Sequence, residues 1–119
     1  MNKWPKSVNV AGRIYPVKYI DGLVDENDLG QVQHRFPEML IARSRRVSSG
    51  YRDLPEADVF ETFLHELTHA MFRQNELLNA MIGNGDDAAQ EKWIYTFAIM
   101  LADTLLRNGI VTLPDGRPK

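Results

Sequence analysis

The sequence predicts an α+β fold, in which a small twisted sheet of about three to four strands packs on one helix and a second long helix follows. Short β-rich segments fill the first half of the chain, and apolar residues recur at helical spacing in the second half. The 119 residues are enough for one core, so we treat 1–119 as a single domain. Its tail, at about 113–119, is expected to be frayed.

The β-rich half reads as two hairpins separated by turn residues. The predicted strand segments are 8–11, 14–20, 31–34 and 39–43. Pro16 cannot donate a ladder hydrogen bond, so we expect its strand to run along a sheet edge at that point. The polar, arginine-rich stretch 44–53 is expected to be a loop.

Two helices are predicted after this stretch. The first should run from about Pro55 to about Asn75, with Asp53 and Glu56 spaced as in a capping box. Its apolar stripe consists of Phe60, Phe63, Leu64, Leu67 and Met71. The second should run from about Asp87 to Arg107, after a turn at 83–86. Its residues Trp93, Phe97 and Met100 form a second stripe, read as core in preference to a dimer face.

Composition excludes several function classes. The chain has no cysteine, which removes disulfide frameworks, thiol catalysis and cysteine-based zinc fingers. The formal net charge of −2 gives no reason to expect nucleic acid or a membrane surface as a partner. No apolar run reaches membrane-spanning length, and the first residues lack the apolar core of a secretory signal. The expected compartment is the cytoplasm, and the oligomeric state cannot be read.

The chemistry is carried by the motif His65-Glu66-Leu67-Thr68-His69 in the first helix. Residues four apart on a helix are neighbours on one face, so both imidazoles can bind one tetrahedral ion. Glu66 lies about a quarter turn from His65 and can reach a metal-bound water without being a ligand. This arrangement is typical of metal-assisted peptide hydrolysis, in which the carboxylate takes the proton of the water.

A catalytic zinc usually has three protein ligands, so a third must come from elsewhere in the chain. Glu91 is the first candidate, because it shares a face of the second helix with the apolar residues Ile94 and Ala98. A carboxylate on a buried apolar face needs a positive partner. The alternative is that Glu91 only complements the helix dipole. Asp87 is the reserve candidate, and Glu76 is a weaker one.

Three further features have plain structural explanations that we prefer. His34 follows a predicted strand and is expected to be an exposed turn histidine. Tyr95, one turn after Glu91, could direct its hydroxyl to the site, but a packing role is the preferred interpretation. A basic cluster made of Arg43, Arg45, Arg46 and Arg52 is expected to be a solvated surface, with recognition of an acidic substrate as the alternative.

The stretch from Glu61 to Ala70 resembles the active-site helix of small gluzincin-type metallopeptidases, including the ImmA/IrrE-like domains and their short prophage-encoded relatives. Residues 91–98 look like the start of the next helix of that family, which supplies the third ligand. The resemblance implies a minimal zincin-like fold, zinc bound by His65, His69 and Glu91, and Glu66 as general base. It also implies that a protein or peptide substrate pairs with the strand near 39–43.

Two functions therefore compete at this point. The first is a zinc-dependent peptidase of narrow specificity, related to phages or mobile elements. The second is a zinc-stabilised protein-interaction module that cleaves nothing. Glu66 favours the first, because a structural zinc site does not need a carboxylate beside an open coordination position. A metal-free domain is the third hypothesis, and metal analysis of the purified protein separates it from the other two.

Overall fold

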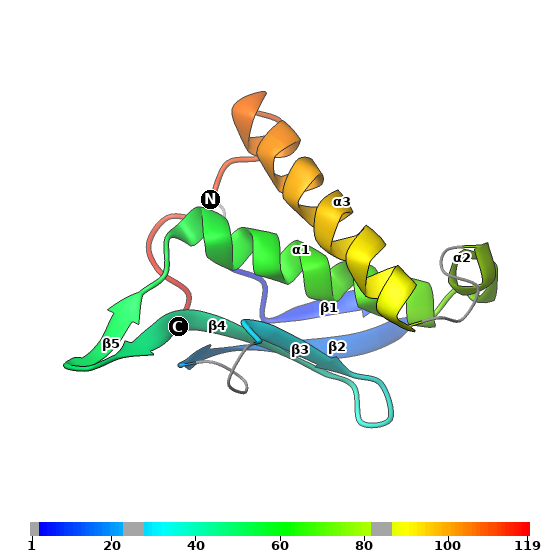
Figure 1. Ribbon diagram of the computed structural model, residues 1–119, viewed down its shortest axis with the longest axis horizontal. Coiled ribbons are helices and arrows are strands. Elements are labelled where there is room, and N and C mark those ends of the chain that lie inside the picture. Colours follow the sequence, from blue (N-terminus) through cyan, green and yellow to red (C-terminus); the bar gives the residue numbers. More distant parts are fainter. Residues whose placement is uncertain (1–2, 23–27, 82–86) are drawn as a thin grey trace.

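The computed structural model describes residues 3–22, 28–81 and 87–119. They form an α+β fold, as predicted, with a mixed five-stranded sheet followed by two main helices (Figure 1). The elements are β1 (Ser7–Val10), β2 (Arg13–Asp21), β3 (Gly30–Gln33), β4 (Glu38–Val47), β5 (Gly50–Asp53), α1 (Glu56–Arg73), α2 (Glu76–Met81) and α3 (Asp87–Arg107). The strand order is β1-β2-β4-β3, and β5 also pairs with β4. The predicted turn at 83–86 lies outside the described residues.

Both predicted hairpins are confirmed. Strands β1 and β2 are antiparallel, and the turn residues Ala11 and Gly12 both have positive φ, 53° and 90°. Two consecutive positive φ values are typical of the hairpin turn whose twist matches the flanking strands. Strands β3 and β4 form the second antiparallel pair. Strand β2 lies inside the sheet, but its parallel ladder with β4 begins only at Val17. Among the described residues, Pro16 therefore pairs only with β1, through Ser7.

The prediction of a loop at 44–53 was wrong. Strand β4 continues to Val47, and the chain turns back as β5, with Ser44 opposite Asp53. All four residues of β5 are exposed, so this hairpin has no alternation of apolar and polar residues from which a strand could be predicted. The hairpin projects beyond the rest of the sheet (Figure 1).

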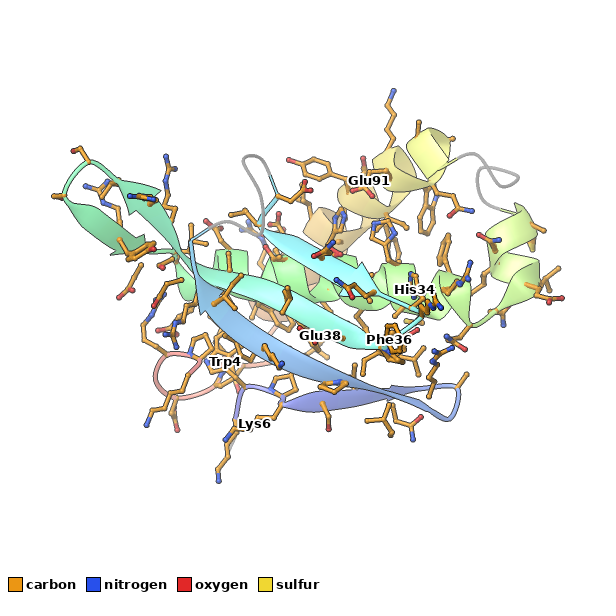
Figure 2. The ribbon with its side chains drawn as sticks, turned by 90° about the horizontal axis from the view of Figure 1, so that it is seen from below. Trp4, Lys6, His34, Phe36, Glu38 and Glu91 are labelled. Carbon is orange, nitrogen blue, oxygen red and sulfur yellow. The ribbon has the colours of Figure 1, made fainter. Side chains whose placement is uncertain are left out.

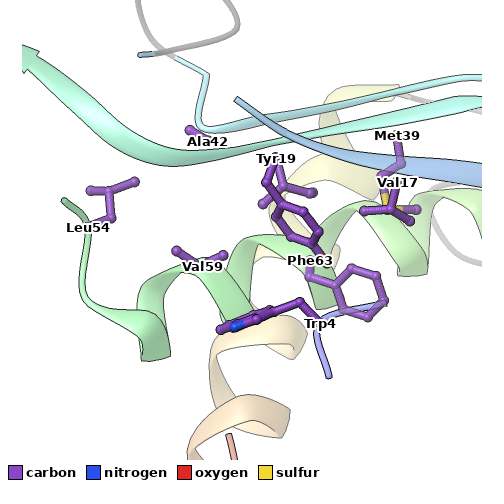
Figure 3. Packing of buried hydrophobic residues seen from close by; sticks show 9 residues of the cluster. Trp4, Val17, Tyr19, Met39, Ala42, Leu54, Val59 and Phe63 are labelled. Carbon is purple, nitrogen blue, oxygen red and sulfur yellow. The ribbon is translucent and has the colours of Figure 1, made fainter. Parts of the chain in front are cut away.

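Helix α1 packs on one face of the sheet, and the core lies between them (Figure 3). Met39 and Ile41 from β4 and Val59 from α1 are completely buried there. Burying such a side chain stabilises the fold by about 1.5–3 kcal/mol. Phe63 of the predicted apolar stripe is buried in this core, whereas Met71 remains 46% exposed. The core therefore fixes α1 against β4 and β3.

The start of α1 differs from the prediction. Pro55 occupies the N-cap position without a side-chain hydrogen bond, and Asp53 belongs to β5, so there is no capping box. Past the end of α1, the Asn75 side chain accepts a hydrogen bond of 2.9 Å from the Leu78 N–H and begins the short helix α2. The sequence analysis missed this helix, although asparagine is a favoured N-cap residue.

The chain end, which was expected to be frayed, makes hydrogen bonds to distant parts of the chain. The Arg117 guanidinium donates hydrogen bonds to the carbonyls of Arg43 (2.9 Å) and Leu54 (2.7 Å). The Trp4 indole N–H donates to the Gly116 carbonyl at 3.0 Å, and Pro118 is buried. Each bond satisfies a backbone oxygen with a side chain that is far away in sequence. The tail is therefore held against the sheet and the N-terminal segment.

Helix α3 packs on α1 through Ile94, Ala98 and Ala102, which are buried as predicted. The expectation that its second stripe is core was wrong, because Trp93 is 41% exposed, Phe97 40% and Met100 66%. Trp93 stacks on Phe97 with ring centroids 4.8 Å apart. Despite this apolar surface, none of the described helices is long and apolar enough to cross a membrane.

Candidate metal centre

Helix α1 places His65 and His69 side by side, one turn apart. Their ring centroids are 5.0 Å apart, and their Nε2 atoms are separated by 3.2 Å. The side chains are 16% and 25% exposed, respectively, so both are largely shielded but still accessible from one side. The same-face placement expected from the spacing is confirmed.

Glu91, near the start of α3, reaches both imidazoles. One carboxylate oxygen lies 2.7 Å from the His65 Nε2, and the other lies 2.6 Å from the His69 Nε2. In Figure 2, Glu91 projects from α3 beyond the sheet edge formed by β3. The three side chains form a group whose ligand atoms lie within 4.8 Å of one another. The structure therefore brings together the three residues that the sequence analysis selected.

The reasoning that selected Glu91 was nevertheless wrong in one respect. Its side chain is 52% exposed, so it does not lie on a buried apolar face in need of a positive partner. The cause of its position is the packing of α3. Buried Ile94 and Ala98, one and two turns further along, dock on α1 and hold the start of α3 over the histidines.

The donor set fits a zinc ion. Tetrahedral zinc binds imidazole nitrogen and carboxylate oxygen at about 2.0–2.2 Å, which requires ligand atoms about 3.3 Å apart. The three contacts of 2.6, 2.7 and 3.2 Å mean that the ligand atoms need to separate only slightly. A metal ion would bind the deprotonated Nε2 atoms, so its binding would release any proton held there. Imidazole and carboxylate are common zinc ligands, and they also suit other transition metals.

A cavity of about 470 Å³ opens over this group, bounded by α1, α3 and the chain segment that leads into β3. Four carboxylate residues line it: Asp28, Glu61, Glu66 and Glu91. Carboxyl groups clustered in a recess favour the binding of a cation, and a bound cation in turn favours their ionised form. The electrostatics of the cavity thus agree with the donor geometry.

Glu66 is the most deeply buried of these carboxylates, at 6% exposure. Burial raises its pKa to about 8, and the nearby Glu91 and Asp28 carboxylates add to the rise. Desolvation and like charges both disfavour the ionised form, whereas a bound cation would favour it. Glu66 therefore occupies a position in which a proton can be held or released near neutral pH.

This pKa predicts how the stability of the metal-free protein depends on pH. An unfolded glutamate ionises near pH 4.5, whereas folded Glu66 ionises near pH 8. Between these values the unfolded state binds fewer protons, so Glu66 makes the protein less stable as the pH rises. Chemical unfolding of the EDTA-treated protein at pH 5 and pH 8 should show a larger loss of stability for the wild type than for Glu66→Gln. An equal loss of stability in the two proteins would contradict the raised pKa of Glu66.

Gly30 allows β3 to approach α1 closely at this cavity. A Cβ atom at this position would lie 2.7 Å from the Thr62 Cγ2 and 2.9 Å from the Glu66 Cγ. Glycine within a strand often marks such a close approach. The sequence analysis did not identify this role of Gly30.

We predict that Gly30→Ala lowers the free energy of unfolding by roughly 1–3 kcal/mol, because the added methyl group overpacks a filled site. Thr62→Ser removes the nearer of the two obstructing atoms and should restore part of the loss in the double variant. Urea denaturation measures both effects. Gln31→Ala, at the next and exposed position of β3, is the control. Equal stability of Gly30→Ala and Gln31→Ala would contradict the prediction.

The other residues that the sequence analysis considered lie as follows. Tyr95 lines the cavity, with its ring edge-on to His65 at 6.2 Å, and is 58% exposed, so the preferred packing role does not describe it. Glu76 is an exposed residue of α2 and is not part of the metal-ligating group. The side chain of Asp87 lies outside the described residues.

His34 follows β3, as predicted, but it is half-buried and not freely exposed. Its Nδ1 lies 3.2 Å from the Tyr15 hydroxyl, which accepts a hydrogen bond of 2.8 Å from the Gln74 side-chain amide. Burial lowers the pKa of His34, and the charges of Arg73, His69 and Arg13 lower it further. His34 does not line the cavity.

The strand near 39–43 cannot pair with a substrate as the resemblance implied. Residues 39–41 of β4 pair with β2 on one side and with β3 on the other. The edge strand beside the cavity is β3, whose first residue is Gly30. Comparison with protein-family models, with curated proteins and with solved structures finds no match for this chain.

Proposed function

We propose that this protein is a zinc-dependent peptidase. The observation that carries the proposal is the convergence of His65, His69 and Glu91 at a cavity that also contains a buried carboxylate, Glu66. A structural zinc site would not require that fourth group. A tetrahedral zinc ion held by these three residues would keep its fourth coordination position for water or substrate, as hydrolytic zinc sites do.

The four residues would divide into three metal ligands and one general base. Zinc, when held by His65, His69 and Glu91, supplies a Lewis acid that acidifies water and polarises the peptide carbonyl. Glu66 accepts the proton of the attacking water on a carboxylate oxygen and passes it to the nitrogen of the leaving amine. Its burial supports this role, because a carboxylate with a raised pKa is a competent proton donor near neutral pH.

An extended polypeptide fits the edge of β3 that pairs with no other strand among the described residues. Addition of a strand to an exposed sheet edge provides main-chain hydrogen bonds, and the lack of a side chain at Gly30 lets β3 itself lie close to Glu66, so a strand added to β3 would run beside the cavity. This placement replaces the one at 39–43 and brings a peptide bond to the cavity. The proposed substrate is therefore a protein or peptide segment in extended conformation.

Metal binding is the first test. Zinc in hundredfold excess over its Kd should stabilise the folded state by about 2.7 kcal/mol, which raises Tm by roughly 10 °C for a domain of this size. Thermal unfolding of EDTA-treated protein, with and without zinc, measures the shift, and elemental analysis gives the stoichiometry. A protein that binds no transition metal, and whose Tm does not respond to one, would contradict the proposal.

The zinc-stabilised interaction module is the second candidate. The exposed Trp93–Phe97 stack on α3 favours it, because paired aromatic side chains at a surface are common in protein interfaces. Both candidates predict zinc binding, and cleavage separates them. Cleavage of a mixed peptide library that depends on Glu66 supports the peptidase, whereas binding of zinc without any cleavage supports the module.

A further inference from the structure

The hairpin of β4 and β5 carries arginines whose charge the described chain does not neutralise. Arg45 and Arg52 are both exposed and lie directly opposite each other, and Arg46 occupies the next position. Like charges that face each other across antiparallel strands destabilise the pair. Among the described residues none of these three arginines forms an ion pair, whereas Arg43 at the base of the hairpin pairs with Asp21.

This hairpin continues the sheet edge that passes the metal-ligating group. Strand β3 pairs with residues 38–41 of β4, and β5 pairs with 44–47 on the same side, opposite β2. The Leu29 carbonyl accepts a hydrogen bond from the Ala42 N–H (2.7 Å), and the Leu54 N–H donates to the Arg43 carbonyl (3.0 Å), so one edge follows directly on the other.

The separation between the cavity and the arginines matches a few residues of extended chain. Ile41 is the partner of Gly30 at the cavity, and Arg45 is the fourth residue after it along β4. At about 3.3 Å per residue, this spans roughly 13 Å. Figure 1 shows the hairpin projecting from that end of the sheet. A polypeptide extended along β3 would reach the arginines about four residues beyond the segment at the cavity.

We propose that the β4–β5 hairpin binds an acidic segment of an extended polypeptide whose neighbouring residues lie in the cavity. The proposal rests on the proposed peptidase function and names its class of substrate. Guanidinium groups bind carboxylates through two parallel hydrogen bonds, and two opposed arginines offer two such forks on one face. A bound acidic segment would also remove the repulsion between Arg45 and Arg52, which explains why both charges are tolerated.

A polypeptide fits this surface better than nucleic acid does. Beside the hairpin, the cavity is lined by Asp28 and Glu61 in addition to Glu66 and Glu91, and the whole chain has a net charge of −2. A nucleic acid carries a negative charge at every phosphate and would be repelled along the cavity. A peptide can place carboxylates at the hairpin and neutral residues at the cavity.

Binding of labelled peptides to the zinc-loaded full chain tests the proposal, with the Glu66→Gln substitution present so that no peptide is cleaved. The probes are a fluorescein-labelled peptide that contains four consecutive glutamates and the same peptide with glutamines. At low salt, fluorescence anisotropy should show about tenfold tighter binding of the glutamate peptide, and this preference should shrink as salt screens the charges. Arg45→Ser/Arg52→Ser should abolish the preference.

The control is Arg35→Ser/Arg107→Ser, which removes the same charge from two exposed positions elsewhere and should keep the preference. The Arg45→Ser/Arg52→Ser protein should have a Tm equal to or above that of its parent, because the repulsion is gone, so a loss of binding cannot be attributed to misfolding. Equal binding of the two peptides, or an undiminished preference in Arg45→Ser/Arg52→Ser, would overturn the proposal. Tighter binding of single-stranded DNA than of the glutamate peptide would overturn it too.

The result is independent of whether the protein cleaves peptides. If the protein shows the arginine-dependent preference but hydrolyses no peptide, binding of an acidic partner is supported and the peptidase function is contradicted. If the protein cleaves peptides in a zinc-dependent reaction but shows no such preference, the peptidase function is supported and the proposed role of the hairpin is contradicted. The two failures are therefore distinguishable.

Discussion

Replacing His69 by alanine is expected to lower the affinity for zinc by about a thousandfold, because an apparent binding free energy of about 10–16 kcal/mol is shared among few ligands. The loss should be this large because, within the part of the chain that the structure describes, His69 supplies one of the three ligand atoms that lie within reach of one another. Competition with a chromophoric zinc chelator measures the affinity, and elemental analysis of the purified variant measures occupancy. The rise in Tm on adding zinc should disappear as well.

The matched control is His34→Gln, which alters the remaining histidine of the chain. His34 lies against Tyr15 and does not line the cavity, so its replacement should leave zinc affinity within a few-fold of that of the wild type. Glu91→Gln should resemble His69→Ala, because an amide oxygen is a much weaker zinc ligand than a carboxylate. Retention of full zinc affinity by His69→Ala would exclude the proposed centre. A comparable loss in His34→Gln would place the ligands elsewhere.

The sequence was sufficient for those parts of the structure that depend on local spacing. The placement of His65 beside His69 follows from helical geometry alone, and the bounds of α3 agree with the predicted 87–107. The hairpin at Ala11 and Gly12 was predictable from turn chemistry. Each of these features is determined within a few residues of chain, so tertiary packing did not need to be known.

Features that depend on distant contacts were not predictable in the same way. Glu91 reaches the histidines because α3 docks on α1 through Ile94 and Ala98, and the burial argument that selected it does not hold for a half-exposed side chain. The tail is held by Arg117, whose carbonyl partners come from β4 and the segment before α1. A hydrogen bond between residues more than sixty positions apart leaves no periodic signal in the sequence.

The β4–β5 hairpin and the surface of α3 show a second limit. Periodicity reports burial, so strands exposed on both faces carry no pattern, and an apolar stripe is read as core even where it faces solvent. The exposed Trp93 belongs to an apolar stripe that was read as core. The opposed Arg45 and Arg52 belong to a strand pair that has no periodic pattern. Departures of this kind concentrate at surfaces with a function, and the proposed binding role of the arginine hairpin agrees with this.

Glu66→Gln is expected to reduce the rate of peptide cleavage by about 10²–10⁴-fold, the contribution of a positioned general base. The amide has nearly the same size and shape as the carboxylate but cannot accept the proton of the attacking water. Zinc affinity should change little, because Glu66 is not among the ligands. Removing a buried carboxylate should leave the folded state as stable or more stable at pH 8, given a pKa of about 8 for Glu66. Cleavage of a peptide selected from the library, at verified equal zinc content, measures the effect.

Glu61→Gln provides the matched control, because Glu61 also lines the cavity, lies on the same helix and undergoes the same change from carboxyl to amide. Burial raises the pKa of Glu61 as it does that of Glu66, but its side chain is less enclosed. A change limited to the electrostatics of the cavity would affect both variants alike, whereas proton transfer at one atom requires Glu66 alone. Equal cleavage by wild type and Glu66→Gln would refute the catalytic assignment. Equal losses in both variants would show that the negative charge of the cavity, and not a general base, determines the rate.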